Sequence, residues 1–221
     1  MKKEIEPIAY IKNDFTSKFG IPRQSGLTDL LSTVVFEREY SDPTAIRGIE
    51  GFSYLWLIWG FSQNETPKRF SPTVRPPRLG GNKRVGVFAS RSPFRPNGLG
   101  LSSVKLIEIK EGRLIVSGAD LMDGTPIYDI KPYVPYSDSH PDALGGFSVD
   151  GNEYSLQVEC DPLLLEKIPL EKRESLLQIL AQDPRPAYQE EGRVYGFLFG
   201  QWEIRFCVLK GVLKVESIEN V

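Results

Sequence analysis

The sequence predicts a mainly β protein, with a sandwich or barrel in its N-terminal part and a small α+β domain after it. Short runs of β-branched and aromatic residues recur up to about residue 140, separated by Gly and Pro turns and without a long helical period. No G-x-G-x-x-G motif stands between a strand and a helix, which argues against a dinucleotide-binding Rossmann sheet. A helical pattern follows only in the last third of the chain.

The N-terminal elements are predicted from their composition. Residues 26–31 could form a short helical turn. Residues 101–109 and 113–121 are predicted to form a hairpin across Lys110, Glu111 and Gly112. Further strands are expected at 31–39, at 52–61, and at 84–90, where Val85, Val87 and Ala89 would share one side.

A change in composition, toward Gly and Pro, predicts a domain boundary near residue 145. Pro141, Gly145, Gly146 and Gly151 form a plausible linker, so we expect domains at 1–143 and 150–221. In the second domain Asp161 and Pro162 suit an N-cap and first helical residue. The other expected elements are a strand at 152–160, a helix at 169–183 that ends before Pro184, and strands at 193–200 and 202–219.

Composition narrows the class of protein. The 221 residues are 40% hydrophobic, enough for a sizeable core, and the formal net charge is −2. Cys160 and Cys207 lie in alternating apolar runs and are expected to be buried thiols, and with one histidine, His140, they cannot build an ordinary zinc site. The N-terminus lacks the apolar core of a signal peptide, and the longest apolar run, residues 54–61, is too short for a bilayer. We expect a cytoplasmic protein without a metal or a membrane segment.

Positive charge is concentrated in one stretch. Residues 66–107 hold nine Lys and Arg residues and no acid, although the whole chain is slightly acidic. Such a cluster is either a solvated basic surface or a patch that binds a polyanion, of which nucleic acid is the commonest.

Two turn-rich motifs carry residues suited to ligand binding. In "SRSPFRPNG" (90–98) prolines stiffen a loop, so an arginine there is pre-organised for a carboxylate or phosphate. In "GADLMDGTPIYDIKPYVPYSDS" (118–139) the aspartates could accept hydrogen bonds from a ribose diol or an ammonium group, serve a metal-dependent nuclease, or simply form turns. A weaker motif, "GIPRQSG" (20–26), presents polar side chains on a fixed loop.

Together these stretches resemble a known family. "GIPRQSG", "VRPPRLGGNKRVGVFASRSPFRPN", "GADLMDGTPIYDIKPYVPY" and "QDPRPAY" are similar to segments of the TrmO (YaeB-like) tRNA methyltransferases. The resemblance implies a homodimer that uses S-adenosylmethionine on a β-barrel rather than a Rossmann sheet. It also implies methylation of the exocyclic amine of threonylcarbamoyl-adenosine, next to the anticodon in threonine tRNAs.

The resemblance also implies site residues. The cofactor site would be lined by Pro22, Arg23, Gln24, Gln63, Arg91, Leu101, Asp120, Leu121, Met122 and Asp123. Contacts to tRNA are expected from Lys83, Arg84, Arg95 and Arg185, and activation of the acceptor nitrogen from Asp183 or Tyr188 on a rigid, exposed turn. The chain departs from the family pattern at Ser62, where a histidine is expected, and at Gly98 and Leu99, where Pro-Ile is expected.

Two other functions fit parts of the sequence. A non-catalytic RNA-binding module would explain the basic stretch but would leave "DLMDGTP" without a role. A metal-dependent nuclease would explain the acids but lacks a convincing set of ligands.

Overall fold

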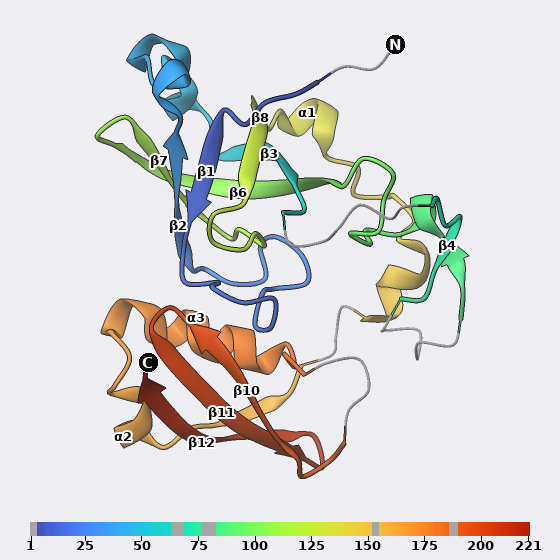
Figure 1. Cartoon of the computed structure of the whole chain (residues 1–221), viewed down its shortest axis with the longest axis vertical. Coiled ribbons are helices and arrows are strands. Elements are labelled where there is room, and N and C mark those ends of the chain that lie inside the picture. The colour runs from blue at the N-terminus through green and yellow to red at the C-terminus, as the bar shows by residue number, and fades with distance from the viewer. Residues whose placement is uncertain (1–3, 63–68, 77–82, 152–154, 186–189) are drawn as a thin grey trace.

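Six antiparallel strands close into a barrel in the N-terminal part of the chain (Figure 1). The computed structural model describes residues 4–62, 69–76, 83–151, 155–185 and 190–221. Around the barrel the order is β1-β2-β7-β6-β3-β8, and closure comes from β1 pairing with β8 at Ala9↔Ile127. The strands are β1 (Ala9–Lys12), β2 (Leu31–Phe36), β3 (Tyr54–Gly60), β6 (Leu99–Lys110), β7 (Arg113–Ser117) and β8 (Pro126–Pro132). The expected barrel is therefore confirmed.

Alternating side chains fill the barrel. Leu55, Leu57 and Trp59 of β3 point inward and are buried, because successive residues of a strand face opposite sides. Val104 on β6 and Leu114 on β7 complete the same core. The interior is thus packed with side chains, and any ligand site must lie at the rim or in the loops.

The predicted hairpin is confirmed with a tight turn. Strands β6 and β7 pair from Lys110↔Arg113, with only Glu111 and Gly112 between them. Both turn residues have positive φ, 51° and 72°, as a type I′ turn requires.

Two local predictions were wrong. Residues 84–90 form only the short strand β5 (Val85–Gly86), which pairs with β4 (Thr73–Val74), before the 3-10 turn η5 (Val87–Ala89). The chain turns there because Val87 is buried and the Ser90 amide donates back to its carbonyl. Residues 26–31 are not helical, since the Gly26 amide instead donates to the Gly118 carbonyl at 2.8 Å.

Short elements connect the barrel strands, and β1 itself was not predicted. Three 3-10 turns lie between β2 and β3, and two more short elements precede the C-terminal half. They are η1 (Arg38–Tyr40), η2 (Pro43–Ile46), η3 (Ile49–Gly51), α1 (Pro135–Asp138) and η6 (Gly146–Gly151).

A four-stranded sheet and two helices form the C-terminal half, as expected. The sheet order is β10-β11-β12-β9, with β9 (Gln157–Glu159) parallel to β12. The Asp161 carboxylate caps α2 (Pro162–Leu165) by accepting from the Leu163 amide, as predicted. The helix α3 (Leu170–Ala181) lies between the barrel and the sheet, whose other strands are β10 (Val194–Phe199), β11 (Trp202–Leu209) and β12 (Val212–Asn220) (Figure 1).

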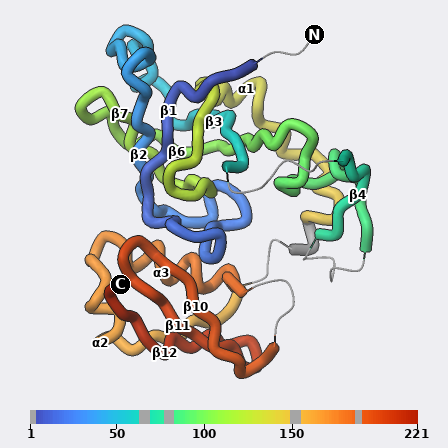
Figure 2. The backbone as a smooth tube through the Cα atoms, in the orientation of Figure 1, coloured from blue at the N-terminus to red at the C-terminus, as the bar shows by residue number. Residues whose placement is uncertain are grey.

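The loop between β1 and β2, residues 13–30, joins the two halves (Figure 2). Its Phe15 and Leu30 are buried in the C-terminal core, beside α3 and the sheet. The Asp14 carbonyl accepts from the Gly200 amide at 2.7 Å, and its carboxylate pairs with Lys172 at 2.8 Å. The C-terminal core is therefore completed by N-terminal residues, and the expected boundary between residues 143 and 150 stays a prediction.

Two features expected from composition can be compared with the structure. Cys160 and Cys207 are free thiols, but both are half-buried rather than buried. Cys207 lies on the outer face of β11, because it alternates with the buried Phe206 and Val208. Among the described residues, no helix is both long and apolar enough to cross a membrane.

We expect Phe15→Ala to destabilise the protein by about 3–5 kcal/mol, because it empties a buried aromatic site at the junction of the two halves. Urea unfolding followed by tryptophan fluorescence measures this loss. Phe19→Ala is the matched control, since Phe19 lies in the same loop but is 52% exposed. Equal unfolding midpoints for the two variants would contradict the structural role of Phe15.

Candidate functional site

Three of the segments singled out in the sequence meet beside the barrel. A guanidinium nitrogen of Arg91 donates to the side-chain oxygen of Gln24, which links loop 20–26 to the loop before β6. The Gly26 amide donates to the Gly118 carbonyl, which links the same loop to the turn after β7. Residues far apart in the sequence are thus brought together at one site.

Asp120 is the acidic group at this meeting point. Burial raises the pKa of its carboxyl above the ordinary value, and hydrogen bonding from Ser102 together with the charge of Arg91 opposes that rise. The Ser102 hydroxyl donates to the carboxylate and in turn accepts a hydrogen bond from the Trp59 indole at 2.9 Å. The carboxylate is therefore held in one orientation by a chain of buried donors.

Sequence reasoning missed Ser102 and Trp59. Ser102 occupies an inward position of β6, opposite Leu57 and next but one to the buried Val104. A polar residue at a core position of a strand was the available signal, because a buried hydroxyl needs a partner.

The residues after Asp120 form a turn that contacts within the protein hold in place. Leu121 is fully buried in the barrel core. The Asp123 carboxylate accepts a hydrogen bond from the backbone amide of Asn13 at 3.1 Å and lies 3.5 Å from the Lys12 ammonium. Asn13, which the sequence did not single out, also donates to the Leu121 carbonyl at 2.9 Å and so fixes this turn.

Loop 20–26 connects the site to the C-terminal half. Pro22 is buried, and Arg23 donates to the Asp183 carbonyl at 3.1 Å. The two segments enclose a recess of about 20 Å³, room for about one water molecule. Asp183 therefore lies one contact away from the cofactor candidates.

The expectation of an exposed turn at 182–185 was wrong. Asp183 is 1% exposed and Arg185 is 9% exposed. The Arg185 guanidinium grips the Asp183 carboxylate with two hydrogen bonds of 2.6 and 2.7 Å. Burial of the pair follows from this pairing, which compensates both charges. Tyr188 and Gln63 lie outside the described residues.

The remaining candidate residues are either exposed to solvent or partly buried by contacts within their own loop or turn. Lys83, Arg84 and Leu101 are exposed, and Leu101 lies on the outer side of β6. Arg95 donates to the Ser90 carbonyl at 2.7 Å and to the Val87 carbonyl at 3.4 Å, so it braces its own loop. Met122 is half-buried beside the turn.

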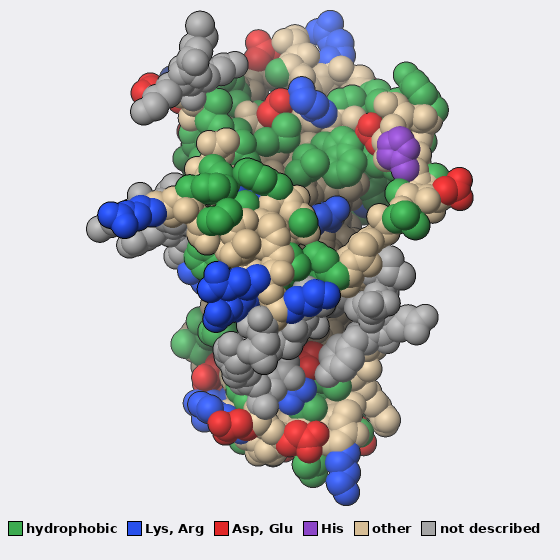
Figure 3. Space-filling model, turned by 90° about the vertical axis from the view of Figure 1, so that its right-hand side faces the viewer, with side chains coloured by type: hydrophobic (Ala, Val, Ile, Leu, Met, Phe, Trp, Pro, Cys, Tyr) green, Lys and Arg blue, Asp and Glu red, His purple; other side chains and the backbone are tan. Residues whose placement is uncertain are grey.

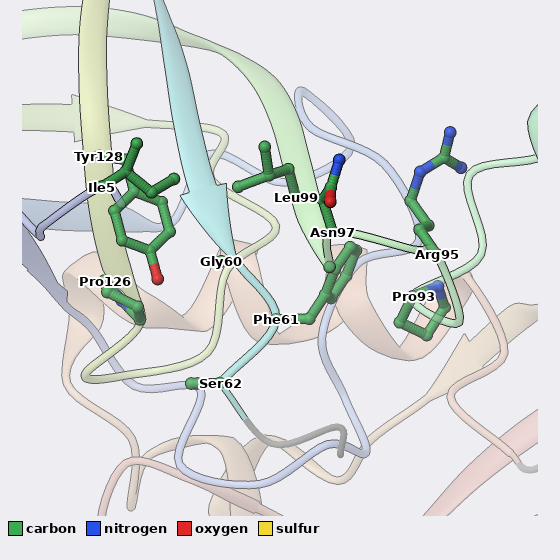
Figure 4. Close-up of a pocket in the computed structure, with 11 residues that line it drawn as sticks. Ile5, Gly60, Phe61, Ser62, Pro93, Arg95, Asn97, Leu99, Pro126 and Tyr128 are labelled. Atoms are coloured by element: carbon green, nitrogen blue, oxygen red, sulfur yellow. The ribbon is translucent and has the colours of Figure 1, made fainter. Parts of the chain in front are cut away.

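A cavity of about 220 Å³ lies next to these segments, at the ends of β3, β6 and β8 (Figure 4). Tyr128 and Ile5 line one side, and Leu99, Asn97 and Phe61 lie across from them (Figure 4). Exposed Ser62 lies at its edge, so this departure from the family pattern leaves room where a histidine would stand.

Within the described ranges, no group of three His, Cys, Asp or Glu side chains could hold a metal ion.

Both halves of the chain match domains of one family. Residues 10–139 match the tRNA-methyltransferase O N-terminal domain, and residues 153–221 match the TrmO C-terminal domain. A relative from Escherichia coli strain K12, named tRNA (adenine(37)-N6)-methyltransferase, is 38% identical over 98% of this chain and 97% of its own length. A relative of the same name from Eikenella corrodens is 45% identical over 77% of this chain and 98% of its own length.

Solved structures agree with the sequence matches. The crystal structure of TrmO from Pseudomonas aeruginosa superposes with a TM-score of 0.80, at 33% identity and 100% coverage of both chains. A second TrmO crystal structure gives a TM-score of 0.82, also at 33% identity and full coverage. The barrel, the C-terminal sheet and the converging motifs thus agree with the sequence matches over both halves, and the chain belongs to the TrmO family of tRNA methyltransferases.

Proposed function

We propose that this protein transfers a methyl group from S-adenosylmethionine to the exocyclic amine of threonylcarbamoyl-adenosine, next to the anticodon of threonine tRNAs. Its relatives support the more general statement that it is an S-adenosylmethionine-dependent tRNA (adenine-N6)-methyltransferase. Among them is a probable S-adenosyl-L-methionine-binding protein from Pyrococcus abyssi, which is 38% identical over 70% of this chain. The threonylcarbamoyl substrate and a homodimeric assembly are the finer parts of the proposal.

The observation that carries the proposal is the meeting of Gln24, Arg91 and Asp120 at one site. S-adenosylmethionine, when bound, supplies a methyl group on a positively charged sulfur, together with a carboxylate, an ammonium and a ribose diol. A buried carboxylate suits the ammonium or the diol, and an exposed guanidinium suits the carboxylate. The residues present therefore fit this cofactor, and a non-catalytic RNA-binding module would leave Asp120 buried at a cost without a use.

The chain's own part in the reaction is alignment. Arg91 and Asp120 belong to different loops, and their positions are fixed by Gln24 and Ser102, respectively. Rigid placement of a donor next to an acceptor lowers the entropic cost of an in-line displacement. Pro22, Arg23, Gln63, Leu101 and residues 121–123 complete the proposed cofactor site.

On the acceptor side we assign different roles to the two candidates. Both carboxylate oxygens of Asp183 accept hydrogen bonds from Arg185, so this pair would position the following segment. Tyr188, five residues on, would then contact the acceptor base or increase the nucleophilicity of its nitrogen by a hydrogen bond. Lys83, Arg84 and Arg95 would contribute positive charge toward the tRNA backbone. Arg185 would not, because it is buried and its charge is compensated by Asp183.

The substrate is tested with two preparations of threonine tRNA, one carrying the threonylcarbamoyl group and one lacking it. We expect methyl transfer from labelled S-adenosylmethionine to the modified tRNA only, because binding of the threonylcarbamoyl group would position the amine for transfer. Mass analysis of the nucleosides locates the methyl group. Equal transfer to the unmodified tRNA would contradict the proposed substrate, and sedimentation of the free protein tests the homodimer.

Arg91→Ala should weaken S-adenosylmethionine binding by about 10- to 150-fold, since a charge-assisted hydrogen bond is worth about 1.5–3 kcal/mol. Fold stability should change little, because Arg91 is exposed and its charge offsets the burial of Asp120 less than the Ser102 hydrogen bond does. Titration calorimetry measures the affinity. Arg113→Ala, a change at another exposed arginine, at the tip of the β6–β7 hairpin, serves as the control. Wild-type affinity in the Arg91 variant would remove this residue from the site.

Tyr188→Ala should lower kcat at least tenfold, about 1.4 kcal/mol of transition-state stabilisation, with little change in S-adenosylmethionine affinity. Arg185→Ala should lower activity too, and also stability by about 3–5 kcal/mol, because it leaves the Asp183 carboxylate buried without its charge partner.

The double variant Asp183→Asn, Arg185→Gln separates these two effects of the pair. It removes both charges together, so stability should largely return while activity stays low. Full activity in the double variant and in Tyr188→Ala would reduce residues 182–189 to a structural connector.

A further inference from the structure

A small basic arm stands out from the barrel on one side (Figure 1). It consists of residues 69–76 and 83–91, which contain the two-stranded sheet of β4 and β5 and the turn η5. Among the residues that the structure describes, its strands pair only with each other, at Thr73↔Gly86 and Val74↔Val85. The arm is therefore an appendage of the barrel rather than part of its wall.

Two phenylalanines on this arm form a stacked pair open to solvent. The ring centroids of Phe70 and Phe88 lie 6.2 Å apart, with an interplanar angle of 25°. Phe70 is 61% exposed and Phe88 is 72% exposed. Neighbouring large apolar side chains left in water are typical of an interaction surface.

The pair is held in place by the backbone beneath it. Val87, the neighbour of Phe88, is buried, and its amide donates to the Pro72 carbonyl at 2.9 Å. Arg95 and the Ser90 hydroxyl both donate to the Val87 carbonyl. Because Val87 and Phe88 are adjacent, fixing the first directs the second outward, and the rings form a pre-organised platform.

The arm that carries this platform is rich in positive charge. Arg69, Arg75, Lys83 and Arg84 are all exposed on the arm, and the whole interval 66–107 contains no acid. Figure 3, which views the molecule from the side of the arm, shows Lys and Arg side chains next to hydrophobic ones across the middle of that face. An aromatic surface on an arm rich in cations matches a single-stranded polyanion whose bases are unstacked.

We propose that Phe70 and Phe88 form a stacking platform for an unpaired base of the RNA substrate, while the arm's cations contact the flanking phosphates. The inference rests on the proposed function, because it assigns a second binding surface to the same tRNA. Unpaired bases occur in the loops of a tRNA, and every base offers a face for stacking irrespective of its sequence. The arm would thus hold the loop while the acceptor base reaches the cofactor site.

The experiment uses the full-length protein and two RNA probes, the anticodon stem-loop of a threonine tRNA and the same stem as a blunt duplex. Phe70→Ala and Phe88→Ala should each weaken stem-loop binding about fivefold or more, as expected when a base can no longer stack, and leave duplex binding unchanged. Phe88→Trp should retain binding, whereas Phe88→Leu should not, since stacking needs an aromatic face. Phe52→Ala, at an exposed phenylalanine (37%) before β3, is the control.

Salt dependence separates stacking from charge. The phenylalanine variants should keep the wild-type slope of log affinity against log salt, whereas charge reversal at Lys83 and Arg84 should reduce it by about 0.7 for each phosphate that the arm no longer neutralises. The fluorescence of 2-aminopurine in the loop should be quenched by wild type and less by Phe88→Ala.

Three results would overturn the inference. If both alanine variants bind the stem-loop as wild type does while the protein methylates tRNA, the platform is wrong and the proposed function stands. If the alanine variants sediment with a lower molecular mass than wild type, or if Phe88→Leu still binds the stem-loop, the rings pack against a second copy of the chain instead. If wild type neither binds nor methylates the tRNA, both proposals fail.

Discussion

The loop between β1 and β2 must satisfy two hydrophobic cores at once, and the rest of the site depends on this constraint. It leaves the barrel at Lys12, buries Phe15 under the C-terminal sheet, and returns through the buried Leu30 into β2. The glutamine Gln178 of α3 exchanges hydrogen bonds with Asp29, and Gln182 donates to the Leu27 carbonyl at 2.6 Å. With both ends fixed, the intervening residues 20–26 have little freedom.

This anchoring explains how a surface loop can present ligand-binding groups in a fixed geometry. Gly20 has a φ of 86°, and a Cβ at this position would lie 2.4 Å from the Phe197 ring, so the close approach of loop and sheet requires glycine. Pro22 is buried next, and Arg23 and Gln24 follow with contacts to Asp183 and Arg91. Packing at the junction of the two halves therefore determines where the proposed cofactor residues stand.

Burial of the Asp120 carboxylate lowers the stability of the folded protein when this group is ionised. Because burial raises the pKa of Asp120, the carboxyl of Asp120 binds its proton more tightly in the folded protein than in the unfolded chain. Stability from this group is therefore lost as pH rises from the unfolded pKa through the raised one, and the cost is complete above both. Ser102 and Arg91 offset part of that cost, and ligand donors would offset more, so the site is less than optimal for stability when empty.

The sequence by itself determined the family, most of the elements and most of the candidate residues of the site, although it missed β1 and misassigned residues 26–31 and 84–90. Alternation in 52–61, the turn at Glu111 and Gly112, and the cap at Asp161 are local patterns, and local sterics and hydrogen bonds decide such features. The residues of the proposed cofactor site came from long motifs that resemble those of the family. Tertiary structure decided which polar groups face one another. Only the pairing of β6 with β3 and with β7 places Ser102 between Trp59 and Asp120. Only the packing of α3 buries Asp183 with Arg185 on a turn that the sequence indicated to be exposed. These contacts join residues far apart in the chain, and their free energy depends on desolvation by neighbours that no local pattern reveals.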